Sequence, residues 1–281
     1  MKKKAFTILT ILLVIALAVV IVINVKNNKN EKKDNPTEIK EEAKLSDFIV
    51  DADIEYEIKE KDYVRDQESS KEDSKVNYGI EIKVNNNYQK AEDLKVPHIK
   101  LDSKDAKQIN NELEELYKET MASYNLCAEE STKEDGRSCS QVLTYKAYLY
   151  KDVLSILVIK GAQSTAPWTF DFKSYALDVK TKKKLSYEEV IDKLNLNEKE
   201  TTEKFNQLIL EKIDNDYGDI ELENDILEDS KKEATKIFNE SIKNNSIEVF
   251  VNNEGKLGAI LLPYYNGAQN ADTQYFIFQL S

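Results

Sequence analysis

The single histidine of this 281-residue chain, His98, is the only imidazole available for a catalytic triad or a His-rich metal site. A general base must lie within hydrogen-bonding reach of the group that it deprotonates. His98 follows Pro97 on a short predicted strand, and a proline within a strand is typical of a sheet edge. We therefore expect His98 to be a surface residue. The chain also lacks a glycine-rich phosphate loop, an HExxH motif and a nucleophile elbow, so we assign no catalytic residues.

The acidic segment 214–219 (DNDYGD) is similar to the start of a calcium-binding EF-hand loop. An EF-hand loop has its glycine at the sixth position and a bidentate glutamate at the twelfth. Here the glycine is the fifth residue, and Asp225 stands where the glutamate belongs. The sequence therefore predicts neither a metal site nor a cofactor, and adventitious calcium binding at this segment is the alternative.

Two long polar loops carry the aromatic residues that we interpret as candidate ligand-binding residues. Residues 161–172 (GAQSTAPWTFDF) contain the only tryptophan, Trp168, and residues 263–273 (PYYNGAQNADT) contain Tyr264 and Tyr265. Aromatic side chains mixed with Ser, Asn and Gly on loops are typical of contact surfaces. The alternative is that Trp168, Tyr264 and Tyr265 complete the hydrophobic core beneath the loops.

The two cysteines, Cys127 and Cys139, flank a short polar segment between a predicted helix and a predicted strand. A disulfide that closes such a loop in an oxidising compartment stabilises the fold by about 3 kcal/mol in the chain-entropy estimate. A zinc site would need more ligands than these cysteines and one histidine provide. We predict a disulfide between Cys127 and Cys139, and the alternative is a pair of free thiols in a cytosolic loop.

The stretch 142–190 contains the elements around which the rest of the chain is expected to fold. Residues 142–150 alternate between apolar and other side chains, which predicts a strand, and Lys151-Asp152 follows as a hairpin turn. Residues 153–161 are dense in aliphatic side chains, which is typical of a buried central strand, and residues 174–179 should pair beside them. Ser186 and Glu189 have the spacing of a capping box and predict the start of a helix.

The end of this stretch, SYALDVKTKKKLSYEEV, resembles a segment of the extracytoplasmic domain pair shared by the lysozyme-sensing anti-sigma factor RsiV and the peptidoglycan deacetylase PdaC. That segment typically reads Tyr-x-x-Asp-x-x-Thr-Gly-Lys, followed by Leu and a capped helix. The matching residues here are Tyr175, Asp178, Thr181, Lys183 and Leu185. Lys182 stands where the family usually has a turn glycine.

Two further segments extend the resemblance over residues from about 48 to 281. VPHIKLDSKDAKQINNELEEL is similar to the upstream module of the family, and LLPYYNGAQNADTQYFIFQL is similar to its terminal strands. The resemblance implies the fold of this domain pair, without the anti-sigma domain or the deacetylase domain.

Strands and amphipathic helices are predicted through the rest of the chain. Residues 48–59 and 76–84 are interpreted as a long-looped hairpin. The other predicted elements are an edge strand at 94–101, helices at about 103–124, 198–213 and 223–243, a hairpin at 246–251 and 256–262, and a last strand at 274–280. The predicted fold class is α+β, with antiparallel or mixed sheets packed against amphipathic helices and preceded by one N-terminal transmembrane helix.

The N-terminal residues 5–23 form a run of 19 residues without a charge. At about 1.5 Å per residue, such a helix is long enough to cross the hydrocarbon core of a membrane. Three lysines precede the run, and neither a small-x-small cleavage site nor a lipid-attachment cysteine follows it. We predict an uncleaved signal anchor at 1–25, a polar stalk at 26–46, a first α+β module at 47–165 and a second α+β module at 166–281, packed on the first.

Charge and location limit the classes of function. Lysines flank both ends of the apolar run, so the positive-inside rule does not decide the orientation of this predicted single-pass membrane protein. The predicted disulfide decides it, because disulfides form outside the cytoplasm, and we expect the C-terminal part to be extracytoplasmic. The net charge is −12, and nucleic acid is not expected as a partner because its binding requires a concentrated basic surface. The acidity serves either solubility or the attraction of a cationic partner.

Two functional hypotheses follow. The first is a membrane-anchored binding or sensing module of the cell envelope that is not an enzyme. The resemblance implies as its partner a cationic wall-lytic protein such as lysozyme, or a cell-wall polymer. The alternative is an accessory or catalytic module of a peptidoglycan hydrolase or deacetylase system.

Overall fold

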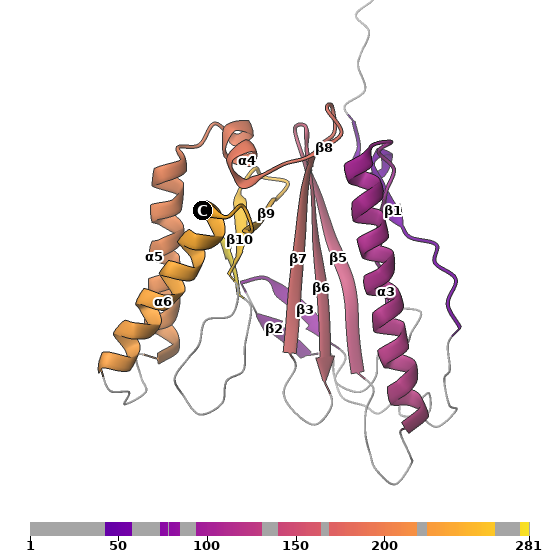
Figure 1. Cartoon of the computed structure of the whole chain (residues 1–281), viewed down its shortest axis with the longest axis horizontal. Helices are drawn as coiled ribbons and strands as arrows, with labels where there is room; N and C mark the ends of the chain where they lie inside the picture. Colours follow the sequence, from indigo (N-terminus) through magenta and orange to yellow (C-terminus); the bar gives the residue numbers. More distant parts are fainter. Residues whose placement is uncertain are drawn as a thin grey trace, which may run out of the picture. The chain divides into compact units, whose positions relative to one another are not determined.

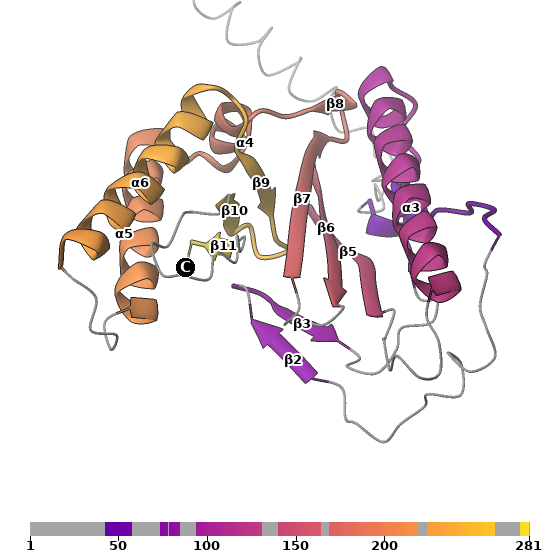
Figure 2. The same cartoon turned by 60° about the horizontal axis from the view of Figure 1, so that its bottom comes forward.

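The computed structural model describes residues 43–57, 74–77, 79–84, 94–130, 140–163, 169–217, 224–261 and 276–280. All of them except Ala43 belong to one unit, Lys44–Ser281. Figure 1 and Figure 2 show this unit from two directions. Its described part is an α+β fold with four α-helices and antiparallel strand pairs, which confirms the predicted α+β class.

A four-stranded antiparallel sheet forms the middle of the unit. Its strands, in spatial order, are β5 (Ser140–Tyr150), β6 (Val153–Gln163), β7 (Thr169–Asp178) and β8 (Lys183–Lys184). The predicted turn at Lys151-Asp152 is confirmed, and Lys151 takes a positive φ of 52° there. The prediction of a central, buried β6 is also confirmed, because every residue from Val153 to Ile159 is buried.

Both faces of β6 are covered, which explains its continuous apolar sequence. Leu154, Ile156 and Val158 point to one face and pack in a cluster with helix α3 (Lys104–Glu130). Leu157 and Ile159 point to the opposite face, where they pack with residues of a second sheet. The central sheet is therefore the layer between two hydrophobic cores.

Helix α3 covers the first face, together with β1 (Ile49–Asp51) and β4 (Pro97–Ile99) (Figure 1). The helix begins where Ser103 Oγ accepts a hydrogen bond from the Ala106 backbone N–H at 3.1 Å. Its apolar positions, at steps of three and four, face the sheet, as predicted. The helix is longer than predicted and continues past Tyr124 to Glu130, so Cys127 lies within the helix and not after it.

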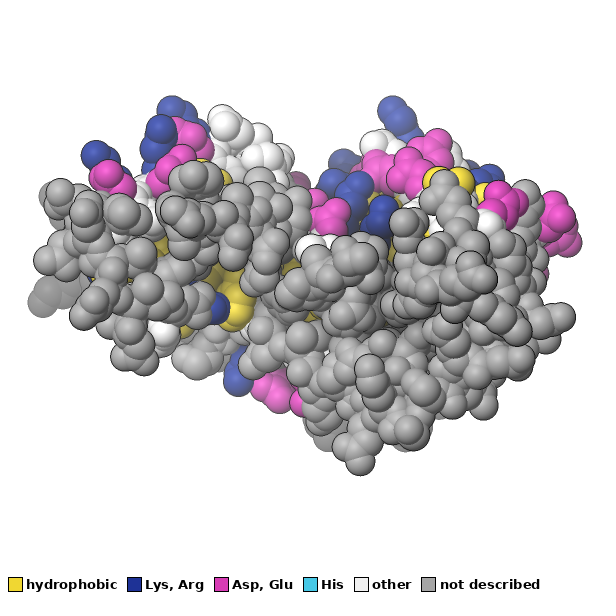
Figure 3. Space-filling model, turned by 90° about the horizontal axis from the view of Figure 1, so that it is seen from below, with side chains coloured by type: hydrophobic (Ala, Val, Ile, Leu, Met, Phe, Trp, Pro, Cys, Tyr) yellow, Lys and Arg dark blue, Asp and Glu magenta, His cyan; other side chains and the backbone are white. Residues whose placement is uncertain are grey.

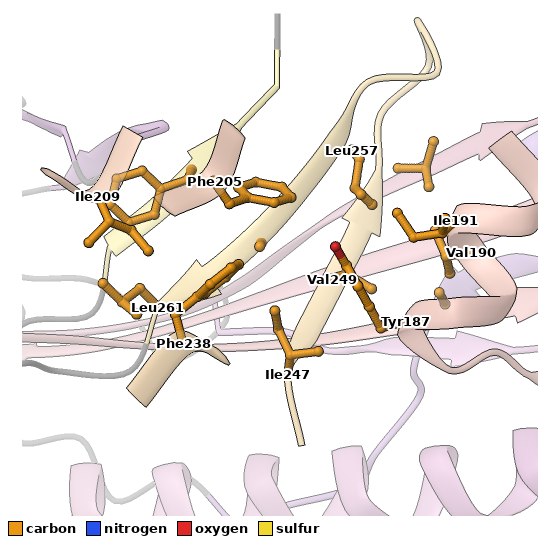
Figure 4. Packing of buried hydrophobic residues seen from close by; sticks show 14 of the residues in the cluster. Tyr187, Val190, Ile191, Phe205, Ile209, Phe238, Ile247, Val249, Leu257 and Leu261 are labelled. Atoms are coloured by element: carbon orange, nitrogen blue, oxygen red, sulfur yellow. The ribbon is translucent and has the colours of Figure 1, made fainter. Parts of the chain in front are cut away.

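A three-stranded sheet and three helices lie on the other side of the central sheet (Figure 2). The strands are β9 (Glu248–Val251), β10 (Leu257–Leu261) and β11 (Phe276–Gln279), and the helices are α4 (Tyr187–Leu194), α5 (Glu198–Tyr217) and α6 (Asn224–Lys243). Figure 4 shows the packing of this region: Phe205 and Ile209 from α5, Phe238 from α6 and Val190 from α4 surround the strands. The predicted helices, the β9–β10 hairpin and the last strand are thus confirmed.

The predicted long-looped hairpin between residues 48–59 and 76–84 is wrong. β1 pairs with β4, and the region 74–84 forms its own hairpin from β2 (Ser74–Asn77) and β3 (Glu81–Val84). Gly79 enables this turn, since its φ is +84° and a Cβ there would lie 1.7 Å from the carbonyl oxygen of Ile277. Glycine is the residue that accepts such a conformation and such a close approach.

The turn after β7 shows the structural role of Asp178, Thr181 and Lys182 in the segment that resembles the extracytoplasmic domain pair. Asp178 is buried, and its carboxylate accepts hydrogen bonds from the backbone N–H groups of Lys180 and Thr181 at 2.8 and 3.0 Å. Lys182 has a positive φ of 60°, a conformation that glycine adopts without strain. The predicted capping box of Ser186 and Glu189 is confirmed at the start of α4.

Among the residues that the structure describes, no helix is long and apolar enough to cross a membrane. The predicted signal anchor at 1–25 and the stalk at 26–46 lie outside the described residues, except for 43–46. β6 pairs with β7 across the predicted module boundary at 165/166, so the central sheet contains strands from both predicted modules. The division into modules stays a prediction.

Candidate functional site

A polar pocket of about 400 Å³ lies beside β7, between the β8–α4 connection and the segment that enters β9. Its lining residues are 173–176, 184–187, 189 and 245–249. Two of these segments are joined by the short β7–β8 turn, whereas 245–249 is more than 50 residues away in sequence. The pocket therefore exists only because β9 approaches the side of β7 that β8, with its two residues, leaves uncovered.

Glu248, the first residue of β9, is the acidic group of this pocket. Its Oε2 accepts a hydrogen bond of 2.5 Å from the backbone N–H of Ser174, in the middle of β7. Glu248 also lines the pocket, and no hydrogen bond joins its Oε1 to a donor among the described residues. If the sheet continued beside Ser174, a backbone carbonyl of the next strand would accept this hydrogen bond, and the Glu248 carboxylate takes its place.

Burial raises the pKa of Glu248 to about 7. The hydrogen bond from the Ser174 N–H and the positive charges of Lys173 and Lys184 act in the opposite direction, and the negative charge of Asp171 raises the pKa slightly. Burial is the strongest of these effects. Glu248 therefore exchanges its proton near neutral pH, unlike an exposed glutamate.

Two lysines and a buried tyrosine stand next to Glu248. The ammonium groups of Lys173 and Lys184 lie 5.4 and 5.7 Å from the ring centroid of Tyr175. Lys173 also pairs with Glu112 of α3 at 3.1 Å, and the Tyr175 hydroxyl donates a hydrogen bond to the same carboxylate oxygen. Lys184 forms no ion pair with any residue that the structure describes, so its charge is available to a ligand.

Two buried serines attach β9 to the central sheet below the pocket. Ser155 Oγ accepts a hydrogen bond of 2.9 Å from the Val251 backbone N–H, and Ser174 Oγ donates one of 3.0 Å to the Val249 carbonyl. The Val251 N–H and the Val249 carbonyl lie on the edge of β9 that does not pair with β10. The serines satisfy buried backbone groups that would otherwise lack partners, and so they hold Glu248 in place.

The second candidate functional feature is a row of acidic side chains on the extended segment 51–57. Ala52, Ile54 and Tyr56 pack against the core, whereas the side chains at the alternate positions are exposed. These exposed residues, called the acidic row below, are Asp51, Asp53, Glu55 and Glu57. Side chains two residues apart in an extended chain are separated by roughly 7 Å.

The segment that carries the acidic row is fixed at both ends. The Ala52 N–H donates to the Val96 carbonyl at 2.9 Å, and Asn125 Nδ2 donates to the Glu57 carbonyl at 2.7 Å. Asp51 is partly neutralised by Lys95 at 3.4 Å. The other three acids of the row form no ion pair with a described residue, so the row keeps most of its negative charge.

The described surface elsewhere is not uniformly acidic. In the view of Figure 3, basic and acidic side chains lie next to one another on the described part of the face. α5 and α6 likewise carry both signs, with pairs such as Lys231 and Asp214 at 2.7 Å. The acidic row therefore differs from these mixed regions, because lysines and acids do not alternate along it.

The three predicted ligand-binding residues, Trp168, Tyr264 and Tyr265, lie outside the described residues, and their role stays a prediction. His98 is an exposed residue of β4, as expected. Cys127 is half-buried, whereas Cys139 lies outside the described residues, so the disulfide also stays a prediction.

The acidic segment at 214–219 is helical as far as Tyr217, where α5 ends. An EF-hand loop is not helical at its first positions, so this geometry does not favour the calcium alternative. Within the described ranges no group of three or more His, Cys, Asp or Glu residues could hold a metal ion.

No family model matches the chain, and a search of curated proteins finds no match either. The candidate site therefore rests on the geometry described above. Sequence reasoning did not identify Glu248, Lys173 or Lys184 as site residues. The only available signal was a glutamate at the start of an otherwise apolar strand, EVFV, and such a residue usually lies in solvent.

Proposed function

We propose that this chain is a membrane-anchored, extracytoplasmic binding or sensing module of the cell envelope, and that it binds a cationic wall-lytic protein such as lysozyme. The acidic row on residues 51–57 is the observation that carries this proposal. Its side chains are exposed, lie on one side of a fixed segment and are poorly neutralised by described residues. Such a row attracts a basic protein and accelerates its association.

The test is the association rate of the full chain, in detergent, with hen egg-white lysozyme at low and at physiological ionic strength. Replacing Asp53, Glu55 and Glu57 together by Asn, Gln and Gln removes three charges and leaves the side-chain volumes nearly unchanged. We expect association to slow by about tenfold, because charge complementarity acts mainly on the association rate. Added salt should reduce the rate of the unmodified chain and have less effect on the variant.

A variant with the same change of net charge at another surface provides the control. Glu200, Glu233 and Glu240 are exposed residues of α5 and α6, and all three can be replaced by Gln. We expect this control to retain most of the association rate. Equal slowing in both variants would mean that only the net charge matters, and absence of binding at low salt would refute the proposal.

The alternative function is an accessory or catalytic module of a peptidoglycan hydrolase or deacetylase system, and Glu248 is the observation that favours it. A carboxyl group with a pKa of about 7 in a polar pocket is suited to act as a general acid. Turnover of soluble peptidoglycan fragments that Glu248→Gln abolishes would support this alternative. Turnover that the variant retains would exclude Glu248 as the acid.

A further inference from the structure

The pocket beside β7 has features that the proposed function does not use. It combines the carboxyl group of Glu248, the ammonium group of Lys184, which forms no ion pair with a described residue, and the ammonium group of Lys173. None of these residues belongs to the acidic row. The pocket and the acidic row can therefore be tested separately.

We propose that this pocket binds a small carboxylate ligand, which pairs with Lys184 and accepts a hydrogen bond from the protonated carboxyl group of Glu248. The ligand carboxylate can be that of a free acid or of a short peptide C-terminus. The geometry supports an anion, because Lys184 lines the pocket and its ammonium group forms no ion pair with a described residue, whereas Lys173 on the same wall is already paired with Glu112. The only described carboxylate bonded to Lys184 is that of Asp105, which accepts from its backbone N–H at 2.8 Å.

A carboxylate fits this pocket better than other classes of small ligand. A cationic ligand would meet the ammonium groups of Lys173 and Lys184. A sugar ring usually stacks on an exposed aromatic face, but Tyr175 and Tyr187, the two aromatic residues of the lining, are both 2% exposed. A dianionic phosphate would lie against two carboxyl groups, those of Glu248 and Glu189. A single carboxylate can share the proton of Glu248 and still pair with one lysine.

The arrangement makes the binding dependent on pH. The charged groups that act on Glu248 are Lys173 and Asp171 from β7 and Lys184 from β8. The charge of Glu248 in turn raises the pKa of Tyr175 on β7. Glu189 contributes a further carboxylate to the lining from α4, and the lining residues that lead into β9 from α6 are Asn245, Ser246 and Ile247, which do not titrate. Since burial raises the pKa of Glu248 to about 7, its proton is present at pH 6 and mostly absent at pH 8.

The experiment is a saturation-transfer NMR titration of the full chain with sodium acetate at pH 6 and pH 8. We expect saturable binding at pH 6 and about tenfold weaker binding at pH 8, because the ionised Glu248 cannot donate the hydrogen bond. Lys184→Gln should weaken binding at pH 6 by about tenfold. Lys183→Gln, at an exposed neighbour that does not line the pocket, is the matched control and should bind as the unmodified chain does.

Glu248→Gln provides the sharpest comparison. Its amide oxygen can still accept from the Ser174 N–H, while its NH₂ group donates to the ligand at any pH. The variant should therefore bind acetate equally at pH 6 and pH 8. The proposal is overturned by absence of saturable binding at pH 6, by unchanged affinity in Lys184→Gln, by a preference for inorganic phosphate over acetate, or by an unchanged pH dependence in Glu248→Gln. The lysozyme assay has no bearing on any of these outcomes.

Discussion

Replacing Glu248 by glutamine should stabilise the fold at pH 8 and have a much smaller effect at pH 5. The pKa of Glu248 in the folded protein is about 7, compared with 4.5 for an ordinary glutamate. The folded state thus binds the proton more tightly than the unfolded state. The stability contributed by this proton is fully present below pH 4.5 and is lost as the pH rises through 7.

The size of the effect follows from the pKa difference. One pKa unit corresponds to 1.36 kcal/mol, so the ionised Glu248 costs about 3 kcal/mol of folding free energy at pH 8. Glutamine has nearly the same shape, keeps an acceptor for the Ser174 N–H and carries no charge. We therefore expect Glu248→Gln to raise the free energy of unfolding by about 2–3 kcal/mol at pH 8 and by less than about 1 kcal/mol at pH 5.

Urea denaturation of the unmodified chain and the variant, each at several pH values between 5 and 8, measures this difference. The comparison with the variant is needed because other carboxyl groups act in the opposite sense. Hydrogen bonds lower the pKa of Asp51, chiefly that from Tyr145, and such a group adds stability as the pH rises. A difference between Glu248→Gln and the unmodified chain that stays constant from pH 5 to pH 8 would refute the reasoning.

Three further changes test the structure around the pocket and the β7–α4 turn by urea denaturation. Ser155→Ala removes the buried acceptor of the Val251 N–H and should lower the free energy of unfolding by about 1–3 kcal/mol; no loss would mean that this bond does not fasten β9. Lys182→Gly removes the strain of a non-glycine residue with a positive φ of 60°, but glycine also increases the entropy of the unfolded chain. The net result should be a rise of roughly 0.5 kcal/mol in the free energy of unfolding. A clear decrease would contradict a strained turn. Burial raises the pKa of Asp178, but the hydrogen bonds from Lys193 and from the backbone N–H groups of the turn have a larger combined effect and lower the pKa overall. The ionised Asp178 therefore stabilises the fold at neutral pH, and this stability is lost as the pH falls below about 4. Asp178→Asn should therefore cost about 2 kcal/mol at pH 7 and much less at pH 3; an equal loss at both values would assign the effect to the turn hydrogen bonds alone.

The sequence by itself predicted the elements whose signals are local. Alternation along β5, the aliphatic run of β6 and the three-and-four spacing on α3, α5 and α6 each reflect which side of one element is buried. The Ser186–Glu189 capping box is equally local, since both partners lie within four residues of one another. Such patterns can be read without knowing what packs against the element.

The pairing of β1 was not predictable in this way. Alternation in residues 48–59 shows that one side of an extended segment is buried, but it does not identify the neighbouring strand. The structure pairs β1 with β4, and the turn at Gly79 closes β2 and β3 into a separate hairpin. The end of α3 was also missed, because residues 125–130 carry no stop signal such as glycine or proline.

Only the tertiary structure identified the candidate site. Glu248 and Ser174 are 74 residues apart, and their hydrogen bond forms because two serines and the surrounding core bring β9 against β7. Burial then changes the chemistry of the carboxyl group, and burial depends on atoms supplied by the whole fold. A sequence specifies which side chain stands at a position, whereas the number of water molecules that can reach it is decided by packing between distant segments.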